Sequence, residues 1–207
     1  MISHALTIVV NEMSKHLADA YGNALPIPVH LGNLAEGFGG NASGGQVPRD
    51  SLVLSIVNIK EDKNLKNIPN YVRDDVTLTA QYQNPPIFLN LQVLVTATHG
   101  SYSDALLSLS RAIRFFQFRN VFTPENVAPA SITTKQPLNV LDQLEVFKLV
   151  FDLYSPSMEE VNHLWGTLGG KQYPFVMYVL RMLDLKFKAT PEAGSLILSV
   201  VRNIQHK

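Results

Sequence analysis

The most regular hydrophobic pattern in the chain is an alternation that begins at Ile87. Apolar side chains occupy every second position from there to Ala97, and the positions between them include Asn90 and Gln92. A period of two places the apolar set on one side of an extended chain, which is typical of a strand with one buried face. The pattern therefore predicts a strand over residues 86–98.

A helical pattern follows this strand. Apolar residues recur at spacings of three and four over residues 101–118, and Ser101 with Asp104 has the spacing of a capping box at a helix N-terminus. The stripe that we expect to lie on the sheet consists of Leu106, Leu109, Ile113 and Phe116. A strand followed by a helix that packs back over it is the central unit of a layered arrangement of helices and strands.

The other periodic segments predict a single α+β domain. Residues 2–21 repeat apolar positions with a helical period. Residues 157–166 form a short helix that is capped by Ser155, or by Ser157 with Glu159 and Glu160 behind it. Further strands are expected near 52–59, 76–83, 145–154 and 175–187, with a short one near 27–31. The predicted fold class is α+β: one domain over residues 1–207, with a mixed β-sheet packed by two main helices.

Three segments carry no clear element. The glycine-rich loop 37–48 lacks the Lys-Ser or Lys-Thr pair with which a phosphate-binding loop holds a nucleotide, so we interpret it as flexible or as ordered only in an assembly. Residues 122–139 are rich in Pro, Ala, Ser and Thr and are interpreted as a long loop. The C-terminal extension 190–207 fits a strand or a helix, and the β-branched Val200 and Val201 favour the strand.

Charge and composition exclude several classes of partner. The chain has 207 residues with 17 basic and 17 acidic side chains, so nothing attracts nucleic acid or an anionic membrane. A neutral, sparsely charged protein is poorly protected against self-association, which favours a subunit of an assembly. The absence of cysteine excludes disulfides and thiolate sites. No secretory signal or membrane-length apolar run is recognised, so synthesis and use in the cytoplasm, without membrane insertion, are expected.

The sequence offers no catalytic constellation. Its six histidines are scattered, and no two have the i, i+4 spacing of a zinc-binding helix. It contains no Gly-x-Ser-x-Gly nucleophile motif, and its paired carboxylates are adjacent in sequence, which turns their side chains apart. We therefore predict that the protein is not an enzyme and that it uses no cofactor and no metal.

A candidate subunit interface lies on the back of the helix at 101–118. If the predicted stripe faces the sheet, the opposite side carries aromatic and arginine residues, a composition that is enriched at protein interfaces. The candidates are Leu107, Arg111, Arg114, Phe115 and Phe118, together with the single tryptophan, Trp165. The alternative is that Phe115 and Phe118 complete the core under the loop 122–139 and that Trp165 is a core residue.

Five segments in a fixed order carry a family resemblance. They are SIVNI at 55–59, NPPIFLNLQVL at 84–94, SYSDALLSLSRAIRFFQ at 101–117, VFTPEN at 121–126 and LWGTLGGKQYPFVMYVLRML at 164–183. This set resembles the cap, or tube-terminator, proteins of phage-tail-like contractile injection systems of the antifeeding-prophage and virulence-cassette type. The similarity extends from about Ile2 to about Leu185.

The resemblance implies a tail-terminator-like fold and a structural function. Cap proteins of this family are implied to form a ring, usually a hexamer, at the end of the inner tube and sheath, where they stop polymerisation and hold the sheath extended. The implied partners are other copies of the chain and the tube and sheath proteins, in a particle that assembles in the cytoplasm and can be released. Two alternatives are open: another subunit of the particle, such as a tube or neck adaptor, and a ligand-binding module or enzyme that uses the glycine-rich loop.

Overall fold

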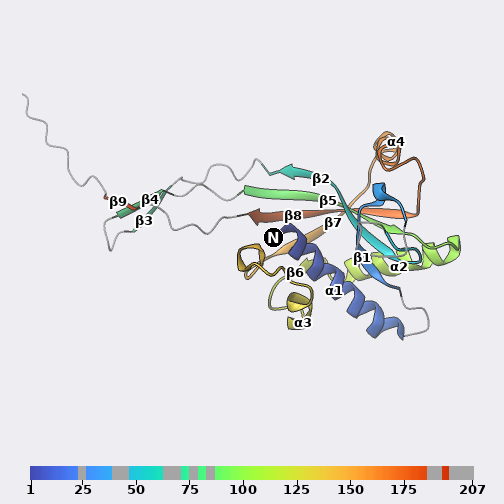
Figure 1. The fold of residues 1–207 in the computed structure, drawn as a ribbon, viewed down its shortest axis with the longest axis horizontal. Helices are drawn as coiled ribbons and strands as arrows, with labels where there is room; N and C mark the ends of the chain where they lie inside the picture. The colour runs from blue at the N-terminus through green and yellow to red at the C-terminus, as the bar shows by residue number, and fades with distance from the viewer. Residues whose placement is uncertain are drawn as a thin grey trace, which may run out of the picture.

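The computed structural model describes residues 1–22, 27–38, 47–62, 71–74, 79–82, 87–185 and 193–195 (Figure 1). Within these residues the helices are α1 (Ile2–Tyr21), α2 (Tyr102–Phe118), α3 (Pro129–Thr133) and α4 (Met158–Thr167), with short 3-10 turns η2 (Leu34–Glu36) and η5 (Val140–Asp142). The strands are β1 (Val29–Leu31), β2 (Leu52–Glu61), β3 (Tyr71–Asp74), β4 (Thr79–Tyr82), β5 (Ile87–Ala97), β6 (Val121–Phe122), β7 (Leu149–Tyr154), β8 (Phe175–Leu185) and β9 (Ala193–Ser195).

The centre of the domain is a six-stranded mixed sheet in the order β1-β2-β5-β8-β7-β6. β1 is parallel to β2, and the other neighbours are antiparallel. The alternating strand β5 lies in the interior of this sheet, where Val95 pairs with Leu54 on β2 and with Val176 on β8. The predicted α+β class, with a mixed sheet packed by two main helices, is confirmed.

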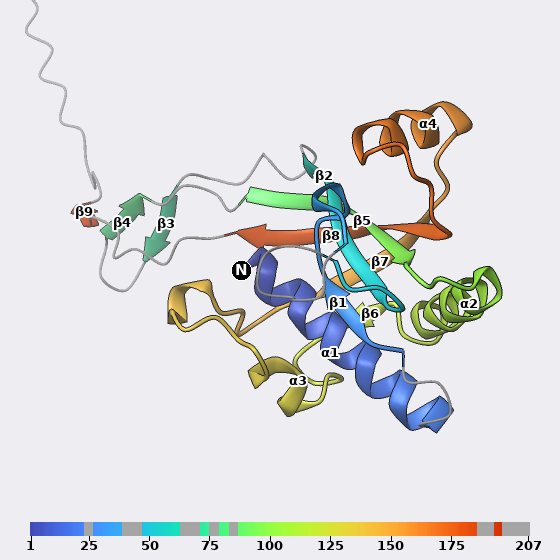
Figure 2. The ribbon, with the colours of Figure 1, turned by 45° about the vertical axis from the view of Figure 1, so that its right-hand side comes forward.

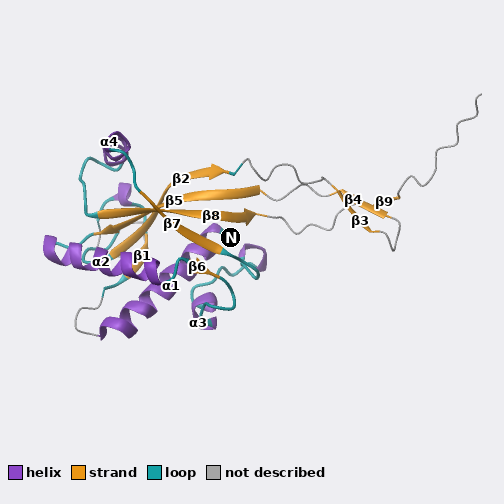
Figure 3. Ribbon diagram, turned by 180° about the vertical axis from the view of Figure 1, so that it is seen from behind, coloured by secondary structure: helices purple, strands orange, loops and turns teal. Residues whose placement is uncertain are grey.

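Helices cover both faces of the sheet. α1 and α2 lie on one face, and α4 lies on the other (Figures 2 and 3). Under α2, the ring of Phe116 lies 4.9 Å from that of Phe151 and 4.3 Å from that of Tyr178, measured between centroids. Neighbouring residues of β5 and β8 point the other way and form a second cluster with Trp165 on α4. Because successive side chains of a strand point to opposite faces, one sheet contributes residues to two hydrophobic cores.

The strand expected at 76–83 does not join the main sheet, which corrects the prediction. β4 pairs instead with β3 and β9 in a separate three-stranded sheet, which Figure 1 shows apart from the six-stranded one. Residues 71–74, where no strand was predicted, form β3. An alternating pattern identifies a strand but not the sheet that it joins, because pairing depends on segments far away in the sequence.

Other loop predictions are tested only in part. The long loop 122–139 contains the five-residue helix α3, so it is not structureless. Residues 39–46 of the glycine-rich loop lie outside the described residues, while Phe38 and Val47 at its ends form a parallel bridge. In the C-terminal extension only β9 is described, so the choice between strand and helix for residues 196–207 also lies outside.

Of the two serines predicted to cap the short helix, Ser157 is the cap, and it forms a complete capping box with Glu160. Ser157 Oγ accepts a bond from the N–H of Glu160 at 3.2 Å, and the N–H of Ser157 donates to Glu160 Oε2 at 2.8 Å. The hydroxyl of Tyr154 donates to the other carboxylate oxygen at 2.8 Å. These two donors, first the Ser157 N–H and then the Tyr154 hydroxyl, lower the pKa of Glu160 below its ordinary value of 4.5.

We expect a pH-dependent contribution of Glu160 to stability. Because its folded pKa is depressed, the contribution is complete above pH 4.5 and is lost as the pH falls through the folded pKa. The stability advantage of the wild type over Glu160→Gln should therefore be largest at neutral pH and shrink below pH 4.5 in urea titrations. Glu159→Gln, on the same turn but outside the capping box, is the control. An advantage that does not change with pH would contradict the assignment.

Candidate interaction surface

The face that α2 buries is set by its small residues. At 100° per residue, the buried positions centre on Ala112. They are Ala105, Ser108, Leu109, Ala112, Phe115 and Phe116. Alanine and serine let the helix approach the sheet closely, so the larger Phe115 and Phe116 fill the space on either side of them. The predicted stripe is therefore partly wrong: Leu109 and Phe116 are buried, but Leu106 and Ile113 are exposed.

The opposite side of α2 exposes several large apolar side chains between the polar residues Ser103, Asp104, Ser110 and Gln117. We define the α2 outer face as Tyr102, Leu106, Leu107, Ile113, Arg114 and Phe118. The ring of Phe118 is 68% exposed, and no acidic residue follows Asp104 in the helix. A solvated helix face is normally rich in charged residues of both signs, and an exposed apolar stripe is typical of a docking surface.

The structure divides the six candidate interface residues into two groups. Leu107, Arg114 and Phe118 lie on the α2 outer face. Phe115 is 1% exposed in the core, as the alternative interpretation held, and Trp165 is buried against Tyr173 and Phe175. The guanidinium of Arg111 is half-buried and lies 4.3 Å from the ring centroid of Tyr21, so it fastens α2 to α1. Phe115 and Trp165 are therefore not available to a partner, and Arg111 is held against α1.

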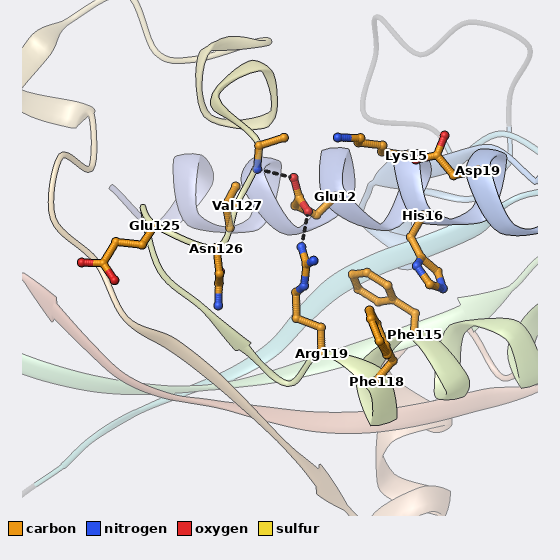
Figure 4. A pocket seen from close by; sticks show the side chains of 11 residues that line it. Glu12, Lys15, His16, Asp19, Phe115, Phe118, Arg119, Glu125, Asn126 and Val127 are labelled. Atoms are coloured by element: carbon orange, nitrogen blue, oxygen red, sulfur yellow. Dashed lines mark hydrogen bonds and ion pairs between the residues drawn. The ribbon is translucent and has the colours of Figure 1, made fainter.

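A groove of about 350 Å³ borders this surface. It lies between α1, the last turn of α2 and the segment that follows β6 (Figure 4). The imidazole of His16 stacks on the exposed ring of Phe118 at 5.6 Å between centroids, so this edge of the α2 outer face is held in place.

A buried carboxylate closes the inner end of the groove. Glu12 is 5% exposed, and its two oxygens accept bonds from Arg119 Nη1 at 2.6 Å and from the N–H of Ala128 at 2.9 Å (Figure 4). Both donors belong to the groove wall, so Glu12 serves to join the end of α2 and the segment before α3 to α1. Among the described residues no group of three histidines, cysteines or carboxylates could hold a metal ion.

A second apolar surface, which the sequence did not reveal, lies on the loop between α3 and β7. We define the 138–146 patch as Leu138, Val140, Leu141 and Val146, of which Leu138 is fully exposed and Val146 is 85% exposed. The loop is fixed to α1 by the buried ring of His4. Its Nδ1 accepts a bond from the N–H of Leu144 at 2.9 Å, and its Nε2 donates to the carbonyl of Ile132 at 2.9 Å.

Comparison with known proteins gives a family and a fold. The model of the Pvc16 N-terminal domain family matches residues 6–199. No curated protein matches the sequence. No helix within the described residues is long and apolar enough to cross a membrane.

Two solved structures are similar. The sheath/tube terminator of the PVC extracellular contractile injection system, in its extended state, matches with a TM-score of 0.58 and 11% identity over 100% of this chain and 64% of that chain. The tube-terminating cap of the anti-feeding prophage matches with a TM-score of 0.53 and 14% identity over 95% of this chain and 60% of that chain. The chain thus spans less than two thirds of the length of either, and the likeness confirms the terminator-like fold.

Proposed function

The chain belongs to the Pvc16 N-terminal domain family, and we propose on that basis that it is a structural cap subunit of a contractile injection system. The match to residues 6–199 confirms the resemblance seen in the sequence and is the observation that carries the proposal. The two similar structures support it, since one is a sheath/tube terminator and the other a tube-terminating cap. In this function the chain ends the inner tube and sheath and stabilises the extended sheath.

The proposed partners are further copies of the chain, in a hexameric ring, and the tube and sheath proteins of the particle. The exposed apolar residues of the α2 outer face support an assembled state, because a monomer rarely leaves such a stripe in water. A terminator needs two unlike surfaces: one that copies the contacts of a tube or sheath subunit and one that offers no site for further addition. The function is not enzymatic, and the proposed location is the particle itself, which is assembled in the cytoplasm and can be released with the chain in place.

We expect deletion of this chain to alter particle length. Tube and sheath proteins should still be made, but particles should be missing, contracted or irregular in length, because nothing ends or holds the polymer. Electron micrographs of particles from the deletion strain measure this. Restoring the wild-type chain should restore uniform length, and restoring Lys60→Glu, on the sheet face away from α1 and α2, should do the same. Uniform, extended particles without any copy of the chain would rule out the capping role.

Imaging the position of the chain separates capping from the nearest alternative. A gold-labelled or tagged chain should lie at one end of the particle, distal to the baseplate. Label along the whole tube would identify a tube subunit instead.

A further inference from the structure

His4, in the first turn of α1, joins the start of that helix to two segments far away in the sequence. Its Nε2 lies 2.9 Å from the carbonyl oxygen of Ile132 in α3, and its Nδ1 lies 2.9 Å from the backbone nitrogen of Leu144, in the loop before β7. Figure 2 shows this loop beside the N-terminal end of α1. The ring is 1% exposed, so water cannot replace either bond unless the structure opens locally.

The two bonds determine which ring nitrogen carries the hydrogen. A backbone N–H can only donate, so Nδ1 accepts from Leu144 through its lone pair and carries no hydrogen. A backbone carbonyl can only accept, so Nε2 carries the hydrogen and donates to Ile132. Together the two bonds require the neutral imidazole in one tautomer.

Protonation of the ring breaks one of these bonds and leaves the other. A proton on Nδ1 removes the lone pair that accepts from Leu144 and sets two N–H donors against each other. The hydrogen on Nε2 is unaffected, so the bond to Ile132 remains. Histidine is the side chain that ordinarily changes its charge between about pH 5 and 8, so mild acid is sufficient to bring about this change.

The charged groups near the start of α1 are of both signs, and the ring bonds to none of them. Its two nitrogens bond to backbone groups instead. The pair of Glu12 with Arg119 lies about two turns further along α1, about 12 Å away. The titratable groups on the other packed segments are the amino group of Met1, His30 on β1, Lys135 after α3, and the exposed side chains of Asp142, Glu145 and Lys148.

The bond to Leu144 matters more for the loop than the bond to Ile132 does for α3. α3 is held to α1 a second time by Asn11, whose Nδ2 donates to the carbonyls of Ser131 at 2.9 Å and Thr134 at 3.0 Å. In the loop, the side chain of Gln143 bonds back to the carbonyl of Pro137 at 2.8 Å, so that bond does not reach α1. The buried Leu144 side chain still packs in the core, so loss of its N–H bond loosens the loop without detaching it.

We propose that His4 is a pH-sensitive latch: the neutral ring fastens the loop before β7 to α1, and its protonation releases the Leu144 N–H while α3 stays in place. The proton comes from water when the loop opens, and no covalent bond of the chain changes. The position of the exposed apolar side chains of the 138–146 patch therefore depends on pH. This inference holds or fails independently of the capping function.

Amide hydrogen exchange as a function of pH tests the latch. From about pH 7.5 to about pH 5, the protection factor of the Leu144 amide should fall by at least about 10-fold, once the pH dependence of exchange in an unfolded chain is divided out. The amide of Thr134, which donates to Ala130 at 2.9 Å within α3, should keep its protection. Over the same range, the nitrogen chemical shifts of the His4 ring should change from those of an imidazole protonated at Nε2 to those of an imidazolium.

Two substitutions at the same position separate titration of the ring from loss of the bond. His4→Asn places an oxygen where Nδ1 lies, so it can accept from Leu144 but cannot titrate, and Leu144 should stay protected at both pH values. His4→Phe offers no acceptor, so the Leu144 amide should exchange quickly at both. His163→Phe, at a side chain that is 80% exposed, should keep the pH dependence of the wild type.

Three results would each overturn the proposal: a His4 ring that stays neutral at the lower pH, a Leu144 protection factor that does not change when the ring becomes charged, and the pH dependence of the wild type in His4→Asn. An equal loss of protection at Thr134 would overturn it too, because the opening would then include α3. If His4→Asn does not fold, the ring shifts and the Leu144 protection of the wild type still decide.

Discussion

Replacing Arg119 by methionine should lower the free energy of unfolding by about 3 kcal/mol. Glu12 is 5% exposed, and its Oε2 accepts a 2.6 Å bond from Arg119 Nη1. Removing the guanidinium leaves a buried carboxylate with only the Ala128 N–H at 2.9 Å, and an unpaired buried charge is far more costly than a pair removed together. Urea unfolding followed by circular dichroism measures the loss.

A double-mutant cycle separates this ion pair from simple loss of packing. Glu12→Gln alone should cost about 1–2 kcal/mol, since the amide oxygen can still accept from Ala128. In Glu12→Gln with Arg119→Met no charge is left buried, so the double variant should be more stable than Arg119→Met alone. If the double variant loses as much stability relative to the wild type as the two single variants lose together, the pair does not couple.

This ion pair could not be found from the sequence, because its partners are 107 residues apart. The helical period identified α1, and Glu12 lies within that helix as a polar residue among apolar ones. Only the tertiary contact of α1 with the end of α2 shows why a carboxylate is buried there. The same limit applies to β4, whose alternation was recognised but whose partners, β3 and β9, were not.

The local pattern of apolar and polar residues was sufficient to predict an element where that pattern alone determines which residues are buried. β5 alternates strictly and lies within one residue of its expected ends, and the short helix begins after Ser157, one of the two serines expected to cap it. The phase of α2 was wrong because large apolar residues lie on both sides of its buried face as well as within it. Small residues at Ala105, Ser108 and Ala112 decide which side approaches the sheet, and a stripe of large residues does not reveal that choice.

The candidate surface was therefore predicted in part. The sequence correctly directed attention to α2, and Leu107, Arg114 and Phe118 face outward there. That these residues form a subunit interface stays a prediction. The 138–146 patch was missed because apolar residues in a loop are ordinarily interpreted as buried, and the exposure of Leu138 and Val146 depends on how the loop is fastened.

Replacing His4 by phenylalanine should cost about 2–4 kcal/mol and should loosen that loop. The N–H of Leu144 donates to Nδ1, so Nδ1 carries no hydrogen, and Nε2 donates to the carbonyl of Ile132. Phenylalanine fills the volume of the 1% exposed ring but offers neither bond, which leaves the buried Leu144 N–H without a partner. Urea unfolding measures the stability, and the exchange rate of the Leu144 amide measures the loop.

The control is His163→Phe, the same chemical change at a side chain that is 80% exposed, which should cost less than about 0.5 kcal/mol. Unchanged stability together with an unchanged exchange rate at Leu144 would show that the two bonds to His4 do not hold the loop.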